Sequence, residues 1–388
     1  MPVPNAGFAL PISPLPRIVR KVGAPLGLII PLGTVAALVV IVLTAANPVG
    51  TAIGFTLASV AMTFVVFAYL WLDRWEPEPP RLLVLAFLWG ASVAVVVSIG
   101  LELYFGQVLA TGDEATDAFV STGIGAPIIE EAAKGLFLLI MMTGRRRNEL
   151  NSLTDCLVYA GITAAGFAWL ENIAYIGGGG SLGESLVTAG MRLIMGPFAH
   201  PLFTTMTGIG VYFALQRRNV IAKAGCILLG YAGAVIMHAL WNGSALVGIE
   251  AYFLLYLFWM VPVFGLAIWL SIRSRRREQR IVAEKLPGMV AAGLITANEA
   301  SWLGSIRTRK LAAAAVKQIG GKPATNVVKR FGTQVVELAF ARDRIDRGFG
   351  DPRVYALLDE ETQNLRAIRA AAAQPTLQWL AGYRLPTR

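Results

Sequence analysis

Long apolar runs occupy most of the first 272 residues and constrain the fold of this chain more than any other feature. A helix needs about 20 apolar residues to cross the hydrocarbon core of a bilayer. The chain has 388 residues, 55% of them apolar, and its mean hydropathy of +0.60 is typical of polytopic membrane proteins. Eight runs are found, at about residues 25–46, 52–72, 82–105, 119–142, 154–176, 187–215, 225–247 and 251–272. The sequence therefore predicts an all-α fold, a membrane bundle of about eight transmembrane helices.

The loops between these runs alternate in charge. The basic loops hold Arg17–Lys21, Arg74 and Arg81, Arg145–Arg147, Arg217, Arg218 and Lys223, and Arg273–Arg277. The opposite loops carry no Lys or Arg and hold Asp113, Glu114, Asp117, Glu184 and Glu250. Because basic loops stay on the cytoplasmic side, the pattern predicts a multi-pass protein of the cell membrane with both termini in the cytoplasm.

Charge and hydropathy divide the chain into three parts: a cytoplasmic N-terminal segment (1–24), a transmembrane domain (25–272) and a basic tail (273–388). The tail holds 21 Lys and Arg against 10 Asp and Glu, a net charge of +11. Its amphipathic patches predict a helical cytoplasmic domain, with breaks at Leu286–Gly288 and Ile319–Gly321. We expect the tail to face anionic lipid headgroups, and the chain has no nucleic-acid-binding signature.

Polar residues interrupt four of the apolar runs, where a charge costs roughly 2.5–3.5 kcal/mol to insert. Both histidines of the chain lie in such runs. The four sets are Glu130, Glu131 and Lys134; Glu171 and Asn172; His200 and Thr204; His238 and Asn242. Most of them fall near the middle of their runs, and Glu171 is nearer the outer end. This pattern predicts one catalytic site between the middle of the membrane and its outer leaflet.

A spacing of four residues places two side chains on one face of a helix. Lys134 can therefore reach Glu130, Thr204 can support His200, and Asn242 can lie beside His238. Arg192 could pair with a carboxylate or extend its charged end towards the membrane surface, and the second is favoured. Glu102 is expected at the interface. Four glycines, Gly161, Gly166, Gly230 and Gly233, are expected to permit close helix packing.

These residue types fit peptide hydrolysis in two ways. His200 and His238 could bind Zn²⁺ with one carboxylate, for which Glu171 is the candidate, and leave a position open for water. Without a metal, one glutamate could act as general base, while the histidines and Asn242 donate hydrogen bonds to the oxyanion. Two other functions remain open: a proton-coupled transporter that uses the buried groups as a relay, and a non-catalytic scaffold.

The motifs resemble those of a known family. EExxK at Glu130–Lys134, FxxxEN at Phe167–Asn172 and the histidines of two later runs look like the PrsW family of intramembrane proteases. The turn at Asp73–Pro79 resembles the DRxEPEP turn of that family, and the likeness covers roughly residues 60–250. The more distant type II CAAX prenyl endopeptidases have EExxxR, FxxxH and HxxxN. Here Lys134 comes one residue earlier than that Arg, and Glu171 replaces the His, which argues against prenylated substrates.

The resemblance implies a bacterial intramembrane protease that cleaves membrane-anchored proteins, including regulators of extracytoplasmic signalling. Glu130 and Glu131 would be the catalytic pair, with His200 and His238 as metal ligands or oxyanion donors. Glu171 and Asn172 would complete the site.

Overall fold

The computed structural model describes residues 26–75, 77–372 and 374–385. These residues form helices and turns, and no β-strand occurs among them, which confirms the predicted all-α class. The predicted N-terminal segment (1–24) lies outside the described residues. The described residues divide into two compact units, one from residue 26 to residue 272 and one that begins at residue 273.

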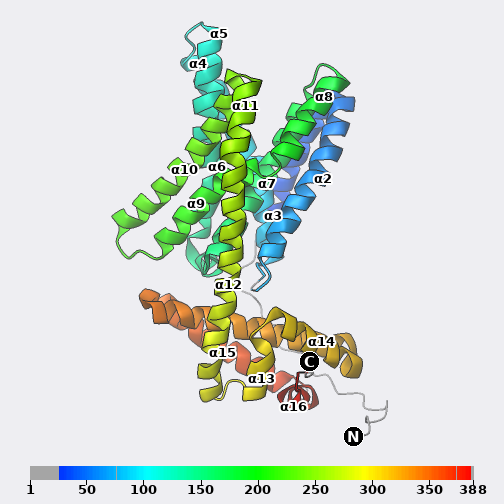
Figure 1. Ribbon diagram of the computed structural model, residues 1–388, viewed down its shortest axis with the longest axis vertical. Helices are drawn as coiled ribbons and strands as arrows, with labels where there is room; N and C mark the ends of the chain where they lie inside the picture. Colours follow the sequence, from blue (N-terminus) through cyan, green and yellow to red (C-terminus); the bar gives the residue numbers. More distant parts are fainter. Residues whose placement is uncertain (1–25, 76, 373, 386–388) are drawn as a thin grey trace. The chain divides into compact units, whose positions relative to one another are not determined.

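The first unit is a helical membrane bundle (Figure 1). Among the described residues, six continuous helical stretches are long and apolar enough to cross a membrane, as judged from length and composition. Its elements are α1 (Leu26–Ala46), α2 (Pro48–Leu72), α3 (Pro80–Trp89), η1 (Gly90–Ala94), α4 (Val95–Val108), α5 (Glu114–Ala118), η2 (Phe119–Gly125), α6 (Ala126–Met141), η3 (Gly144–Glu149), α7 (Leu153–Gly177), α8 (Leu182–Ala189), η4 (Gly190–Met195), α9 (Ala199–Leu215), α10 (Val220–Val247), α11 (Ile249–Leu255), η5 (Tyr256–Met260) and α12 (Val261–Ala291), the last of which contains the boundary between the units.

Two of the expected runs differ from a simple transmembrane helix. The 119–142 run forms the π-helical segment η2 followed by α6, and it holds three charged residues. The 187–215 run is interrupted between η4 and α9. Pro197 explains the interruption, because it lacks a backbone N–H and disfavours helical geometry in the residue before it. The break leaves His200 in the first turn of α9.

Helix α7 lies at the centre of the bundle, enclosed by α2, α3, α6 and α9 (Figure 1). Of its most apolar 18-residue window, 89% is buried, against 22% for α2 and 17% for α10. A Cβ on Gly166 would lie 1.9 Å from the Phe87 carbonyl oxygen, and a Cβ on Gly230 would lie 2.6 Å from the Met206 carbonyl oxygen. The predicted close packing at these two glycines is confirmed.

The two ends of the bundle differ in charge. Asp113, Glu114, Glu184 and Glu250 lie at one end, which we call the acidic-loop end, and Arg145–Arg147, Arg217 and Arg218 lie at the other, the basic-loop end. At the acidic-loop end, Asn47 caps α2 and donates a hydrogen bond to the Gly177 carbonyl oxygen at 2.7 Å.

The Asp73–Pro79 turn is fixed onto α7 near the basic-loop end. The Glu78 backbone N–H donates to Asp73 at 2.7 Å, and the Tyr159 hydroxyl donates to the Glu78 carboxylate at 2.6 Å. Ser152 and Asp155 form a capping box that starts α7. Burial, together with the negative charges of Asp155, Glu149 and Asp73, raises the pKa of Glu78 well above its ordinary value.

The second unit is helical, as the amphipathic patches predicted. It contains the end of α12 and four further helices with one π-helical segment: α13 (Ala297–Leu303), α14 (Ile306–Arg344), η6 (Ile345–Phe349), α15 (Pro352–Ala371) and α16 (Gln374–Gly382). Trp302 and Phe331 are fully buried in it.

One of the two predicted breaks in the tail is correct. Gly321, with φ of 65°, interrupts α14. The break expected at Leu286–Gly288 is absent, and Pro287 lies inside α12. A proline removes one intrahelical hydrogen bond, and here the helix ends about one turn later, at Ala291. The turn that follows contains Gly293, with φ of 67°.

Candidate active site

Helix α6 brings three charged side chains into the interior of the bundle. Glu131 and Lys134 are fully buried, and Glu130 is 5% exposed. Lys134 Nζ lies 2.6 Å from Glu131 Oε1 and 3.2 Å from Glu130 Oε2, so the predicted pair of Lys134 and Glu130 is present. The ammonium group also lies 4.1 Å from the centre of the Phe167 ring, on α7. One cation therefore sits between two adjacent carboxylates.

Glu131 is held by donors from three helices. Besides Lys134, the Thr204 hydroxyl on α9 donates to Oε2 at 2.7 Å, and His238 Nδ1 on α10 lies 3.1 Å from Oε1. Thr204 was expected to support His200, and the structure corrects this: the hydroxyl of Thr204 turns towards α6. Because a buried carboxylate needs donors, this contact gives Thr204 a defined role.

The hydrogen-bond network assigns the tautomer of His238. Glu131 can only accept, so His238 Nδ1 carries the proton, and Nε2 keeps its lone pair. That nitrogen lies 3.9 Å from Glu130 Oε2. The ring of Phe203 stacks on His238, with centroids 4.9 Å apart, and fixes the plane of the imidazole. A carboxylate behind one ring nitrogen with a free lone pair on the other is the usual arrangement of a metal-binding histidine.

His200 and Glu171 form the second half of the site. His200 Nε2 lies 2.7 Å from Glu171 Oε2, and His200 Nδ1 lies 3.3 Å from Lys134 Nζ. Because the ammonium of Lys134 can only donate, His200 Nδ1 accepts and Nε2 donates to Glu171. The two imidazole rings are 5.0 Å apart and nearly perpendicular. The two glutamates of α6 and both histidines thus belong to one network.

Arg192, for which the membrane surface was favoured over an ion pair with a carboxylate, forms such a pair and joins this network. Its Nη2 donates to Glu171 Oε2 at 2.5 Å and its Nε donates to Asn172 Oδ1 at 2.6 Å. The guanidinium lies 4.2 Å from the centre of the Tyr175 ring. The π-helical segment η4 places Arg192 opposite this face of α7, and an arginine inside an apolar run was the signal that could have identified it.

The two asparagines lie around the glutamate–histidine network. Asn172 contacts Arg192, as described. Asn242 Nδ2 donates to the Thr122 carbonyl oxygen of η2 at 3.0 Å. Both side chains therefore position neighbouring segments, and Asn242 also lines the cavity described next.

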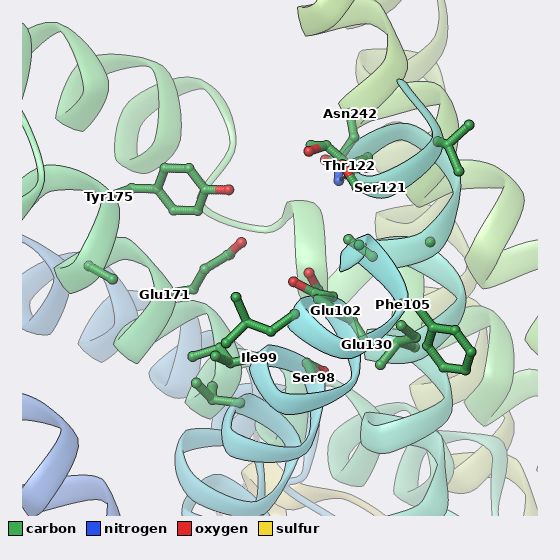
Figure 2. A pocket seen from close by; sticks show the side chains of 18 of the residues that line it. Ser98, Ile99, Glu102, Phe105, Ser121, Thr122, Glu130, Glu171, Tyr175 and Asn242 are labelled. Carbon is green, nitrogen blue, oxygen red and sulfur yellow. Dashed lines mark hydrogen bonds between the residues drawn. The ribbon is translucent and has the colours of Figure 1, made fainter. Parts of the chain in front are cut away.

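A cavity of about 610 Å³ opens beside the network towards the acidic-loop end. Glu130 and Glu171 line it, and Figure 2 shows Glu171 and Glu102 turned towards the same space. Glu102, which was expected at the membrane interface, contributes to the wall of this cavity. The carboxylate-bearing residues Glu130 and Glu171 are therefore reached from this cavity.

The donor set fits a metal ion. Glu130, His200 and His238 each offer a ligand atom, and these atoms all lie within 4.8 Å of one another. Glu171, the carboxylate favoured from the sequence, lies instead against His200 and Arg192. Two histidines and one carboxylate form a common set of ligands for catalytic zinc.

Comparisons with known proteins also indicate a protease. The sequence model of one family, described as PrsW family intramembrane metalloprotease, matches residues 78–267. A protein of Geobacillus kaustophilus named Protease PrsW is 27% identical over 179 residues, which cover 44% of this chain and 72% of the relative. A protein of Oceanobacillus iheyensis with the same name is 21% identical over 225 residues, 58% of this chain and 96% of the relative. No solved structure was found to match the chain.

A multi-pass helical bundle with a buried glutamate–histidine site, matched to proteases of this kind, defines the class of intramembrane proteases. Within that class, the chain belongs to the PrsW family.

Proposed function

We propose that this protease hydrolyses peptide bonds of membrane-anchored proteins at the site formed by Glu130, Glu131, His200 and His238. The observation that carries the proposal is the connection of these four side chains, through Lys134, Thr204 and Glu171, beside a cavity that can admit a peptide. Proteolysis in regulated signalling across the membrane is the role we assign to it.

We further propose that the site holds Zn²⁺ with Glu130, His200 and His238 as ligands. Bound zinc would polarise the peptide carbonyl and lower the pKa of a bound water. Charge supports the assignment. Three carboxylates of the network, Glu130, Glu131 and Glu171, are paired with only two cations, Lys134 and Arg192. A bound cation would offset the excess of negative charge.

The protein side chains have separate tasks in this scheme. Glu131 keeps the proton of His238 on Nδ1, which leaves the Nε2 lone pair facing Glu130. Glu171 holds the proton of His200 on Nε2, so the metal ligand would be Nδ1, whose lone pair accepts from Lys134 Nζ at 3.3 Å in this structure and would turn to the metal. The second carboxylate oxygen of Glu171, Oε1, has no hydrogen-bond partner among the described residues, and Glu171 lines the cavity. We assign to Glu171 Oε1 the acceptance of a proton from the attacking water.

The charge pattern of the loops supports a location in the plasma membrane with both termini in the cytoplasm. The acidic-loop end then faces the outside, and substrates enter the cavity from the outer leaflet. The net charge of +11 in residues 273–388 supports contact of the tail with anionic lipid headgroups.

The test uses the purified full-length chain in detergent and a library of single-span reporter proteins, each with a zinc chelator and without it. We expect cleavage by the wild type, and loss of cleavage in Glu130→Gln, in His238→Ala and with chelator. The exposed Glu114→Gln serves as control and should retain activity. Cleavage that persists in chelator but is lost in the variants would replace zinc with a metal-free glutamate mechanism. Equal behaviour of the wild type and both site variants would contradict the proposed site.

A further inference from the structure

The wall of the cavity is rich in carboxylates and poor in cations. Helix α4, segment η2 with the start of α6, and helix α7 form most of this wall. Four acidic residues contribute to it, Glu102, Asp117, Glu130 and Glu171, and no Lys or Arg is found among the described residues that line it. The cavity therefore has a negative potential, focused by its apolar surroundings.

Two polar side chains of α4 face this cavity without a partner. Ser98 and Glu102 lie four residues apart, so they share one face of the helix. Ser98 is 2% exposed, yet its hydroxyl has no hydrogen-bond partner, and neither has the buried Oε1 of Glu102, among the residues that the structure describes. Figure 2 shows both side chains on the wall of the cavity. The proposed catalytic scheme uses neither of them.

Such unsatisfied acceptors are costly in an apolar environment. A buried polar group without a partner costs about 1–3 kcal/mol, and more if it is charged. In native proteins such a group is commonly completed by an ordered water, an ion or a ligand. The acceptors available here, a carboxylate and a hydroxyl oxygen, call for a ligand with several N–H donors and a positive charge.

The remaining lining of this wall suits the stem of a basic side chain. Ile99, Leu103 and Phe105 come from the same helix and contribute to the same cavity. Lys and Arg bury their methylene stems against apolar surface and carry their donors at the tip. A bare metal ion fits less well, because Glu102 belongs to none of the described groups of side chains close enough to share one.

We propose that Ser98 and Glu102 form a specificity subsite that binds a Lys or Arg side chain of the substrate, close to the scissile bond. This inference rests on the proposed function and names the substrate class: membrane-anchored proteins with a basic residue near the cleavage position. Glu102 acts as the counter-charge and Ser98 as a second acceptor. Binding of the cation satisfies both groups and reduces the negative charge around Glu130 and Glu171.

The experiment measures kcat/KM of the full-length enzyme for reporters that differ only in the residues flanking the cleaved bond, which are Lys, Arg, Gln, Leu or Glu. We expect the wild type to prefer Lys and Arg over Gln by about tenfold or more, since tenfold corresponds to about 1.4 kcal/mol and a buried charge pair commonly exceeds that. Glu102→Gln should abolish most of this preference. Glu102→Lys should reverse it in favour of Glu reporters, and Ser98→Ala should weaken it.

The matched control is Glu114→Lys, the same change of charge at an exposed position of the acidic-loop end that does not line the cavity. It should keep the preference of the wild type. Folding is checked by thermal unfolding, in which Glu102→Gln should be at least as stable as the wild type, because an unpaired buried carboxylate is removed.

The results separate the two proposals. Cleavage by the wild type without preference for Lys or Arg would overturn the subsite and leave the protease function intact. A preference that Glu102→Gln retains in full would also overturn it. Cleavage of none of the reporters would instead contradict the proposed function, and the subsite with it.

Discussion

Thr204 is a single buried residue whose hydroxyl contacts the candidate site. It donates to Glu131 Oε2 at 2.7 Å and is fully buried. Thr207, one turn further along α9, is 2% exposed, and its hydroxyl has no hydrogen-bond partner among the described residues. The two buried threonines of α9 can therefore be compared directly, because only the hydroxyl of Thr204 contacts the candidate site.

Replacing Thr204 by valine keeps the shape and removes the donor. Loss of one hydrogen bond to a buried carboxylate costs about 1–3 kcal/mol, so we expect kcat to fall roughly tenfold or more. KM should change little, because Thr204 does not line the cavity. Initial rates on one cleaved reporter measure both parameters. Thr207→Val is the control and should leave kcat unchanged; an equal loss in both variants would mean that general packing of α9 is responsible.

The sequence predicts contacts within one helix of the site but not contacts between helices. The spacing of four predicted the contact of Lys134 with Glu130, because both lie on one helix. It did not predict the contact of Thr204 with Glu131 or of Arg192 with Glu171, because these partners come from different helices. Rotation of α9 and η4 about their axes decides those contacts, and packing sets that rotation.

Among the elements, the Asp73–Pro79 turn contains an acid that responds to pH. Burial, and then the charges of Asp155, Glu149 and Asp73, raise the pKa of Glu78 well above its ordinary 4.5. The folded protein therefore holds a proton on Glu78 that the unfolded chain releases near pH 4.5. This contribution to stability is complete below that pH and is lost as the pH rises towards the raised pKa.

Glu78→Gln should flatten this pH dependence. The amide cannot ionise, its oxygen can still accept from Tyr159, and the backbone bond to Asp73 is unaffected. The midpoint of thermal unfolding is measured in detergent between pH 5 and pH 8. We expect the wild type to lose stability as the pH rises and the variant to lose less, so that the difference between the two midpoints changes in favour of the variant. Parallel curves for the two proteins would show that Glu78 is not the responsible group. The exposed Glu114→Gln provides the comparison.

Close packing of α3 against α7 depends on Gly166. A Cβ there would meet the Phe87 backbone oxygen at 1.9 Å, and backbone cannot move aside cheaply. We expect Gly166→Ala to destabilise the bundle by more than the usual 1–3 kcal/mol of overpacking, about 3 kcal/mol or above. In Gly100→Ala the Cβ meets nothing within 4 Å, and the gain in helix propensity of about 0.5–1 kcal/mol should remain. Thermal unfolding of both variants tests the contrast, and equal stability would argue against a tight contact.

On the scale of the whole molecule, the separation of acidic and basic loops predicts the orientation in the membrane. Single cysteines at Glu114 and Glu184 should react with a membrane-impermeant maleimide added to intact cells. Cysteines at Arg146 and Ser305 should react only after permeabilisation. The background has Cys156 and Cys226 replaced, since both are free thiols. Labelling in the opposite pattern would invert the proposed topology and place the cavity on the cytoplasmic side.

The sequence by itself determined the class of fold and pointed to most residues of the candidate site. Apolar runs near 20 residues long require helices in a bilayer, and the cost of burying charge makes Glu130, Glu131, His200 and His238 candidates for a functional role. These are local properties of composition and spacing. They also sufficed for the likeness to the PrsW family, which the comparisons bear out.

The tertiary structure alone decided how these residues combine. It grouped Glu130 with both histidines as possible metal ligands, paired Arg192 with Glu171 and placed Glu102 on the wall of the cavity. It also interrupted the 187–215 run, so that His200 lies in the first turn of a new helix. Contacts between helices depend on the rotation and depth of each helix and on where it is interrupted, and packing of the whole bundle sets all three. The residue pattern along one helix does not specify which side chains of other helices lie against it.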